Sequence, residues 1–554
     1  MKSLGLSSAV LMLLLAACDR TVVLDESTMG LLVGPSPAMG AAPLAVGANL
    51  DQPLSVLFAP DDPTLSLELS LIDRVVQARQ ADARTFVTAM NPYRIRYSVI
   101  NISHEAILTR LIDAKEKGVV VQLQIDARYL NVTAAREINL AAHGFNIVPD
   151  HRTLTDSTRA SANFVGITMT SGGLMHTKLR LFETPGSKWL LTGSMNPSTE
   201  AQSNEETLHL IRDPRIIAAY AAAYESIQRG QRPANAWTDG AAVNVLFAPA
   251  GSGPMPGRRV LDWIAAENDL ILLMVFSLRD FTAPGFGKSL VQLLKDKATA
   301  GVPVWVITDR KQADGVDVSG KSISGNDLTD ESLSAAGVHV YKVLNTAGVY
   351  TAMHSKVAIL GRAGQKLITD SANFSLKALG SATTAPSNYE SVLFIDSSAL
   401  DSGLTGRRYL AQWLKVLSRW ADQSAAAGEP AYVEVLRRLA TTGAWPEQSI
   451  NFTALQAYTS FGEEVRVLGS LGPLGVWGTV GTGNLLHTDA MAYPTWRSVT
   501  SVALPLGSWF EWKLAAGWGT GAATRWELGE NRLTFAQPTP LVPNPTVELQ
   551  AQWR

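Results

Sequence analysis

The sequence is nearly free of cysteine: Cys18 is the single one among 554 residues, so the chain has no partner for an internal disulfide. Long apolar runs are also missing, because the run at Val10–Leu15 is too short for a helix that spans a bilayer. The formal net charge is -2, so the chain as a whole is not a polycation that would hold nucleic acid. The net charge does not decide whether a local basic groove exists. No cluster of His, Cys and Asp demands a metal ion, and we expect neither a metal nor another cofactor.

What the sequence does have is apolar content. Hydrophobic residues make up 46% of the chain and charged residues 17%, which is typical of folded proteins rather than disordered ones. A chain of 554 residues exceeds one ordinary core, so several domains are expected.

Residues 1–17 have the pattern of an export signal: Lys2, then the short apolar run, then small residues. They lead into Leu15-Ala16-Ala17-Cys18, which resembles the bacterial lipoprotein box. The resemblance implies cleavage before Cys18 and lipid attachment to its sulfur, and therefore a protein anchored to a membrane of the bacterial cell envelope. An ordinary signal peptide with an incidental cysteine, and hence a secreted protein, is the alternative. Residues 18–50 are rich in Gly, Ala and Pro and are expected to form a tether without a core.

A short pattern, His-x-Lys, occurs twice, at His176 and Lys178 and at His354 and Lys356. In an extended strand, residues two apart project from the same face, so His and Lys of each pair point the same way. Each pair is followed by Ser-x-Asn and then by a glutamate: these residues are Ser194, Asn196 and Glu206, and then Ser371, Asn373 and Glu390. One copy would be weak evidence. Two ordered copies, in a chain with only eight histidines, indicate an internal repeat.

The repeat extends beyond these patterns. Val-Leu-Phe-Ala-Pro opens both halves, at 56–60 and 245–249. Hydrophobic periodicity then predicts a helix, an apolar strand, a second helix and a buried parallel strand in each half. The predicted ranges are 67–81, 85–90, 103–117 and 119–125 in the first half, and 257–267, 270–276, 287–300 and 302–308 in the second. A short strand follows at 145–148 and at 338–343. Alternating strands and helices predict one α/β sheet in each half.

Over about residues 51–422, the chain resembles the phospholipase D superfamily, whose members have two His-x-Lys half-sites that meet at a pseudo-twofold axis. The resemblance implies a multidomain α/β pseudo-dimer of two repeated sheet-and-helix halves, at 51–235 and 240–422. It implies a catalytic set made of His176, Lys178, Asn196, Glu206, His354, Lys356, Asn373 and Glu390. One departure is clear, because the family has an Asp after each Lys where this chain has Glu183 and Gly361.

These residue types suit attack on a phosphodiester, which is already anionic and needs positive charge around its non-bridging oxygens. Lys178 and Lys356 would supply that charge, and the two asparagines would supply amide donors. One neutral imidazole would attack phosphorus to form a phosphohistidine, and the other would protonate the leaving oxygen. The glutamates would accept from the remote ring nitrogens and fix the tautomer. The resemblance implies His176 as the nucleophile and His354 as the acid.

The character of the chain changes at about residue 450, after a segment at 423–448 that is expected to be a linker or to pack against a domain. Trp and Gly become frequent and turn residues recur regularly, as in an all-β sandwich. Residues 449–554 resemble the family 20 starch-binding domain. The matching stretches are Tyr458–Gly469, Leu474–Trp477, Tyr493–Trp496, Phe510–Lys513, Trp526-Glu527, Asn531-Arg532 and Gln552–Arg554.

This resemblance implies a glucan-binding site, in which flat sugar faces stack on exposed indoles while Lys and Asn bind hydroxyls. The site would consist of Trp477, Lys513, Trp526 and Asn531. Trp496 would belong to a second site, in which Phe461 stands where a Tyr is usual. The alternative is that the tryptophans form the core of the sandwich, and it applies above all to Trp509, Trp512 and Trp553.

Together these features predict an exported phosphodiesterase that acts on phospholipid or another phosphodiester and is targeted to starch or glycogen. Three alternatives stay open. A secreted nuclease would use the same residues, although the balanced charge argues against nucleic acid as the partner. A cardiolipin-synthase-like transphosphatidylase would differ only in accepting an alcohol. A catalytically silent glucan-binding surface lipoprotein is favoured by Glu183 and Gly361, whereas the intact His and Lys pairs argue against it.

Overall fold

The computed structural model describes residues 48–86, 90–127, 140–148, 150–161, 163–168, 173–314, 329–343, 353–381, 383–424, 430–519, 521, 523 and 525–554. The predicted export signal, Cys18 and nearly all of the predicted tether lie outside these residues. The chain divides into two compact units: the larger runs up to Gly406, and the smaller contains Arg407–Asp422 and Gly428–Arg554. Among the helices in the described residues, none has the length and apolar character that a membrane crossing requires.

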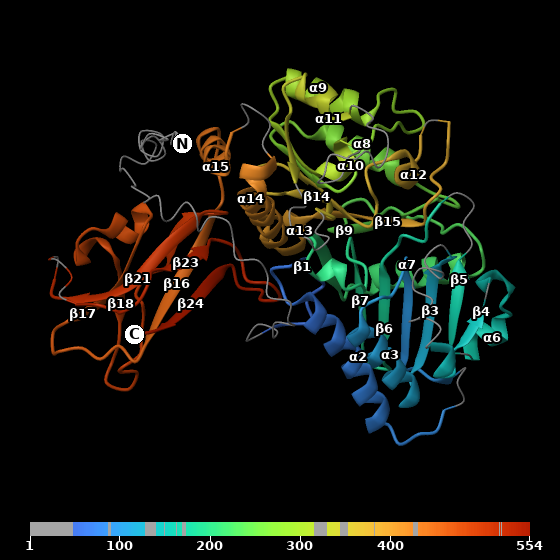
Figure 1. Cartoon of the computed structure of the whole chain (residues 1–554), viewed down its shortest axis with the longest axis horizontal. Coiled ribbons are helices and arrows are strands. Elements are labelled where there is room, and N and C mark those ends of the chain that lie inside the picture. Colours follow the sequence, from blue (N-terminus) through green and yellow to red (C-terminus); the bar gives the residue numbers. More distant parts are fainter. Residues whose placement is uncertain are drawn as a thin grey trace, which may run out of the picture. The chain divides into compact units, whose positions relative to one another are not determined.

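The first half of the larger unit is built on a mixed sheet of eight strands (Figure 1). Its strands are β1 (Leu54–Ala59), β2 (Arg94–Val99), β3 (Val120–Asp126), β4 (Asn146–Val148), β5 (Phe164–Thr168), β6 (Leu179–Glu183), β7 (Lys188–Gly193) and β8 (Glu206–Ile211). They lie in the order β1-β8-β7-β6-β2-β3-β5-β4, with β2, β3, β5 and β4 parallel and the others antiparallel. Its helical elements are α2 (Thr64–Ala81), α3 (Glu105–Glu116), η3 (His151–Thr153), α6 (Asp156–Ser161), η4 (Glu200–Gln202) and α7 (Pro214–Gln228).

The second half repeats this plan with seven strands in the order β12-β11-β10-β13-β14-β15-β9. The strands are β9 (Val243–Ala248), β10 (Ile271–Val275), β11 (Val304–Asp309), β12 (His339–Val343), β13 (Lys356–Leu360), β14 (Lys366–Asp370) and β15 (Glu390–Asp396). The helices are α8 (Pro256–Ala266), α9 (Leu290–Thr299), α10 (Arg310–Asp314), α11 (Thr329–Ser334), α12 (Leu376–Leu379) and α13 (Ser397–Asp401). Counted from β9, this order matches that of the first half from β1, except that β5 has no counterpart among the described residues of the second half. The predicted repeat of two α/β sheets is confirmed.

The local signals read from the sequence explain the centre of each sheet. Both β3 and β11 are buried along their whole length and have parallel neighbours on both sides, as their apolar runs predict. The helices that precede them stop where Gly118 and Gly301 adopt φ values of 85° and 87°. A glycine takes this left-handed conformation without a steric penalty, so it ends a helix well.

One predicted strand of the first half was wrong. The strand that pairs with β3 is β2 at Arg94–Val99, not the apolar stretch at 85–90; residues 87–89 of that stretch lie outside the described residues. The sequence of β2 alternates arginine with apolar residues, so a search for apolar runs passes over it. Arg96 is nevertheless largely buried. Its guanidinium tolerates this position because it lies over the Tyr224 ring at 5.3 Å and donates a hydrogen bond to Glu183 at 2.9 Å.

The smaller unit contains an all-β module, as the C-terminal sequence predicts, and helical segments that precede it in the chain. Its strands are β16 (Glu447–Leu455), β17 (Glu464–Gly469), β18 (Asn484–His487), β19 (Trp496–Ser498), β20 (Val502–Pro505), β21 (Trp509–Gly517), β22 (Arg525–Trp526), β23 (Arg532–Phe535) and β24 (Thr546–Gln552). Its 3₁₀ turns are η5 (Gly472–Trp477) and η6 (Val480–Thr482). Alternate residues of β16 are buried, and Phe452 packs edge-to-face against Trp512 in the core.

Helical segments before the first strand pack on this module. Within the smaller unit, Ser418 of α14 (Leu404–Ser424) accepts a hydrogen bond from the Trp509 indole at 3.0 Å. Tyr432 of α15 (Tyr432–Thr441) donates its hydroxyl to the Gly507 carbonyl, and the Trp445 indole donates to Leu506 at 2.9 Å. The described part of the predicted linker therefore packs against the β module.

Candidate functional site

The two His-x-Lys segments lie at the boundary between the halves of the larger unit. His176 precedes β6, and its backbone N–H donates to the Tyr389 carbonyl at 2.9 Å. His354 precedes β13, and its N–H donates to the Glu205 carbonyl at 3.0 Å. Each histidine segment thus forms a bridge with the segment that leads into the glutamate of the other half. Folding the repeat brings together two sequence patterns that are far apart along the chain.

The histidines and glutamates pair crosswise. His176 Nδ1 lies 2.8 Å from Glu390 Oε2, and His354 Nδ1 lies 2.8 Å from Glu206 Oε1. Each glutamate therefore holds the histidine of the other half. A carboxylate at Nδ1 places the proton there, which leaves Nε2 of each ring as the nitrogen available to a substrate. The sequence predicts glutamates on the remote ring nitrogens, but the two copies give no sign that the pairs cross.

Each glutamate is itself fixed by a serine and an asparagine of its own half. Ser371 Oγ and Asn388 Nδ2 donate to Glu390 at 2.7 and 3.0 Å. In the first half, Ser194 Oγ and Asn204 Nδ2 donate to Glu206 at 2.6 and 3.3 Å. The pattern Asn-x-Glu, at Asn204 and Asn388, is a third element of the repeat that the sequence shows, but no role was predicted for its asparagines.

The lysines are buried and lie close to their histidines. Lys178 Nζ donates to the His176 carbonyl at 2.8 Å, and Lys356 Nζ donates to the His354 carbonyl. Burial lowers the pKa of Lys178 to about 7 and that of Lys356 to about 8, although the nearby glutamates act in the opposite direction. The site therefore contains two ammonium groups that would gain stability from an anionic ligand.

Burial also sets the charge of the other groups. It lowers the pKa of His176, and it lowers that of His354 to about 4, in each case against the attraction of the paired glutamate. Burial by itself would raise the pKa values of Glu206 and Glu390, but the histidine and lysine neighbours outweigh it and leave both below the usual value. At neutral pH the arrangement is two neutral imidazoles between two carboxylates, a form suited to nucleophilic attack.

Asn196 and Asn373 each follow a glutamate-binding serine by two residues and are half-buried. Among the described residues, neither buried Oδ1 atom has a hydrogen-bond partner. Their side-chain amides are therefore not committed at that atom to another part of the described protein.

The two positions that depart from the family pattern have structural surroundings. Glu183 is the last residue of β6, at the opposite end from Lys178, and forms ion pairs with Arg96 at 2.8 Å and Lys188 at 3.2 Å. Gly361 follows β13 with φ 84°, and its N–H donates to the Leu270 carbonyl at 2.9 Å. Neither position is aimed at a histidine, so the two changes leave the crossed pairs intact.

Two aspartates support the segments that precede the histidines. Asp126, at the end of β3, accepts from the Met175 N–H at 2.6 Å. Asp309, at the end of β11, accepts from the Met353 N–H, and burial raises its pKa to about 6. The sequence marks both as the ends of buried strands, but we did not predict this role for them.

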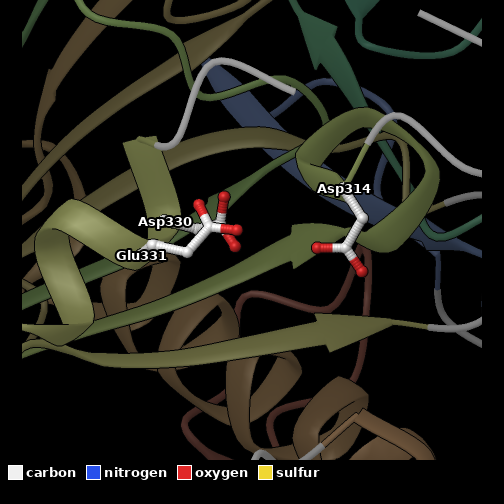
Figure 2. Close-up of side chains that lie close together, drawn as sticks. All are labelled: Asp314, Asp330 and Glu331. Atoms are coloured by element: carbon white, nitrogen blue, oxygen red, sulfur yellow. The ribbon is translucent and has the colours of Figure 1, made fainter. Parts of the chain in front are cut away.

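A separate acidic cluster lies in the second half, where Asp314 of α10 faces Asp330 and Glu331 of α11 (Figure 2). One oxygen from each carboxylate lies within 4.8 Å of the others. The ammonium group of Lys342 lies 2.5 Å from Asp314 and 2.6 Å from Asp330. The cluster therefore contains its own countercharge.

The β module brings Trp477 and Trp526 together, with ring centroids 6.3 Å apart and 51° between their planes. Trp526 is 38% exposed. Lys513, in β21, donates its Nζ to the Gly529 carbonyl at 2.5 Å, and Asn531 Nδ2 donates to Glu511 of the same strand at 2.8 Å. Strand β21 also pairs with β22, where Ala515 lies opposite Trp526. The residues predicted for one glucan site thus lie in one region.

Trp496 does not fit its predicted role in a second site. It is only 8% exposed, lies in the core cluster and donates its indole N–H to the Ala457 carbonyl at 2.9 Å, so its faces are covered by protein. The exposed aromatic residues nearby are others. Tyr458 and Tyr493 pack edge-to-face at 6.0 Å, and Phe461 is fully exposed. Tyr458 and Tyr493 begin two of the stretches that resemble the starch-binding domain, but we did not predict a binding role for them.

Comparison with known families agrees with both units. The model of the cardiolipin synthase, phospholipase D-like domain matches residues 88–228 and 265–406, just over half of the chain. The model of the starch binding domain matches residues 447–539. These ranges contain both crossed pairs and the indole pair.

Individual proteins match parts of the chain. The cyclomaltodextrin glucanotransferase of Bacillus licheniformis is 34% identical over 93 residues, which are 16% of this chain but only 12% of that protein. A phospholipase D family member from Salmonella typhimurium is 20% identical, with a TM-score of 0.23, over 33% of this chain and 95% of its own. The family 20 carbohydrate-binding module of the maltotetraose-forming amylase from Pseudomonas saccharophila is 27% identical, with a TM-score of 0.16, over 19% of this chain and 99% of its own.

Proposed function

The chain belongs to the phospholipase D-like family and carries a starch-binding domain, and we propose that it is a phosphodiesterase that acts through a phosphohistidine and is held on starch- or glycogen-type glucans. The observation that carries the proposal is the crossed pairing of His176 with Glu390 and of His354 with Glu206. In this arrangement a buried glutamate orients each imidazole and leaves its Nε2 atom available to a substrate.

The proposed first step is attack by His176 Nε2 on phosphorus. A phosphorus–nitrogen bond forms, the bond to the leaving oxygen breaks, and His354 donates the proton that this oxygen takes. Because His354 is neutral before substrate binds, we propose that the anionic phosphate raises its pKa and lets it take up that proton. Lys178 and Lys356 stabilise the charge on the non-bridging oxygens, and Asn196 and Asn373 donate amide hydrogen bonds to them.

In the second step, His354 removes a proton from water or from an acceptor alcohol, which attacks phosphorus and releases His176. The residues are the same for hydrolysis and for transfer. Phospholipid is the substrate class we propose first.

In this proposal, the β module holds the protein on its glucan. Paired indoles beside a lysine and an asparagine suit an α-glucan chain, because the apolar sugar faces stack and the hydroxyl groups hydrogen-bond. The pair Trp477 and Trp526 supports this proposal. We further propose that Cys18 carries a lipid anchor and that the protein works at the bacterial cell envelope; Cys18→Ser would then release the protein from membranes.

The deciding experiment is a cleavage assay on the full chain with phospholipid vesicles, bis-nitrophenyl phosphate and DNA, each with EDTA, beside His176→Ala. Turnover that persists in EDTA and disappears in the variant would support the histidine mechanism. Preference for lipid with an added alcohol would favour a transphosphatidylase, and preference for DNA a nuclease. No turnover on any substrate, with amylose binding intact, would refute the catalytic proposal in favour of a silent glucan-binding protein.

A further inference from the structure

The repeat is broken at the residue that precedes the glutamate-binding serine. In the first half this residue is Gly193, with φ 142°; in the second half it is Asp370, with φ 113°. Both conformations belong to the region that glycine adopts freely and that residues with a side chain rarely adopt. The second half therefore keeps a strained aspartate where the fold, judged by its own first copy, accepts a glycine.

The carboxyl group of Asp370 connects the two halves. Its Oδ1 accepts from Thr192 Oγ1 at 2.8 Å, and its Oδ2 accepts from the Tyr220 hydroxyl. Thr192 lies in β7 and Tyr220 in α7, both in the first half, whereas Asp370 ends β14 in the second. All three side chains are fully buried, so each of these bonds is formed away from water, where a lost partner is most damaging.

This contact is connected to both crossed pairs. Asp370 is followed by Ser371, which binds Glu390 and through it His176. Thr192 lies two residues before Ser194, which binds Glu206 and through it His354. A single hydrogen bond between Thr192 and Asp370 thus joins the two strands that deliver the serines.

The charges around Asp370 come from several elements. The titratable groups that face it are Lys178 before β6, His209 of β8 and Tyr220 of α7. His209 Nδ1 lies 4.0 Å from Asp370 Oδ1, and burial lowers the pKa of His209 to about 3, so this imidazole is neutral. Burial raises the pKa of Asp370 itself to about 7, although the hydroxyl donors and Lys178 oppose that rise. The hydroxyl donors are those of Ser391, Tyr220 and Thr192, and the ionised carboxylate is the form that can accept from all of them.

We propose that Asp370 is a positioning residue that sets the two crossed His–Glu pairs in register with each other, through Thr192 and Tyr220. This inference rests on the proposed phosphodiesterase activity of the same site. It explains why a side chain is retained in a backbone conformation that favours glycine: the carboxylate provides a connection that Gly193 cannot provide from the first half.

The test uses four single variants and one double variant of the full chain. Asp370→Gly removes the connection and copies the residue of the first half, so backbone strain cannot explain a loss. Thr192→Val and Tyr220→Phe each remove one donor while keeping the shape, and Thr192→Ser keeps the hydroxyl group. We expect Asp370→Gly and Thr192→Val to lower kcat on bis-nitrophenyl phosphate about tenfold or more, with KM changed less than twofold, and Thr192→Ser to restore most of the loss. The double variant Asp370→Gly/Thr192→Val should be no slower than Asp370→Gly alone, because both remove the same bond.

A second readout does not depend on turnover. Tungstate, a phosphate-shaped oxyanion, should bind the wild-type site in calorimetry and bind about tenfold more weakly to Asp370→Gly and to Thr192→Val. If the wild-type protein shows no phosphodiester turnover, the proposed function fails, and tungstate affinity still decides the role of Asp370. Wild-type kcat and tungstate affinity in Asp370→Gly, or additive effects in the double variant, would overturn the inference.

Discussion

Replacing each glutamate by glutamine tests both the crossed pairing and the role of each histidine. In the structure, Glu390 Oε2 accepts from His176 Nδ1 at 2.8 Å and from Ser371 Oγ at 2.7 Å, while Oε1 accepts from Asn388 at 3.0 Å. A glutamine has one acceptor and one donor at these places. Either its NH₂ group faces the Asn388 amide donor, or it faces Nδ1 and forces the proton onto Nε2, the attacking nitrogen.

Both orientations remove a charge-assisted hydrogen bond and place the glutamine NH₂ group against another hydrogen-bond donor. Such a loss in a buried site costs about 2–4 kcal/mol. If the penalty falls on the transition state, kcat drops about 30- to 1,000-fold, since about 1.4 kcal/mol corresponds to a factor of ten. The same reasoning applies to Glu206, whose two oxygens lie 2.8 and 2.9 Å from His354 Nδ1.

The two variants should differ in their dependence on the leaving group. Glu390→Gln impairs the proposed nucleophile His176, so it should slow both a nitrophenyl ester and an alkyl ester. Glu206→Gln impairs the proposed acid His354, which nitrophenolate does not need in order to leave. We therefore expect this variant to release a burst of nitrophenolate and then to turn over slowly, because His354 must also activate the water of the second step.

Rapid-quench measurement of nitrophenolate and of phosphohistidine would show this difference, with Glu183→Gln as the control, since Glu183 lies at the far end of β6. A burst in Glu390→Gln instead would reverse the assigned roles. Unchanged kcat in both glutamine variants would refute the reasoning that the crossed carboxylates orient the histidines.

Further predictions concern the β module, the lysine charge and the departure from the family pattern. Trp477→Ala and Trp526→Ala should each abolish retardation in amylose-containing gels while turnover of a soluble ester stays unchanged. Because burial lowers the pKa of Lys178 from 10.5 to about 7, the folded protein holds this proton more weakly than the unfolded chain does, and the resulting loss of stability is full below about pH 7 and disappears as the pH rises to about 10. Lys178→Met should therefore raise the free energy of unfolding at pH 7 by on the order of 4 kcal/mol in denaturant titrations while abolishing turnover. Because Lys178 loses its proton near pH 7, kcat/KM should fall as pH rises above about 7. The fall in kcat should begin at a higher pH, because a bound phosphate stabilises the ammonium form of Lys178. Glu183→Ala leaves Arg96 buried without its nearest carboxylate, and should lower the free energy of unfolding by about 3 kcal/mol with little change in kcat.

The sequence predicts the parts of this fold that depend on local pattern. The apolar runs of β3 and β11, the glycines that end α3 and α9, and the repeat of His-x-Lys and Ser-x-Asn can all be read within short windows. The strand β2 was missed because Arg94 and Arg96 interrupt its apolar residues, and only the distant Glu183 and Tyr224 make Arg96 acceptable inside.

The features that the sequence does not reveal depend on how distant segments meet. Glu206 and Glu390 are equivalent in the repeat, so the sequence has no means of assigning each one to its own histidine or to the other. Trp496 and Trp526 are both tryptophans in a binding-module motif, yet one is 8% exposed and the other 38%, because only the first lies in the core cluster of the β module. Asp370 differs from Gly193 in the sequence, but its partners Thr192 and Tyr220 become visible only when the halves are assembled.

The exchange of glutamates between the halves bears on how such a chain could arise and diverge. One copy alone holds a histidine without its acceptor, so a protein with a single copy would work only as a symmetric pair of identical subunits. Joining two copies in one chain preserves that dependence and also lets corresponding positions differ, as Gly193 and Asp370 do. A division of labour between attacking and proton-donating histidines then becomes heritable, whereas in a symmetric pair every substitution would appear on both sides at once.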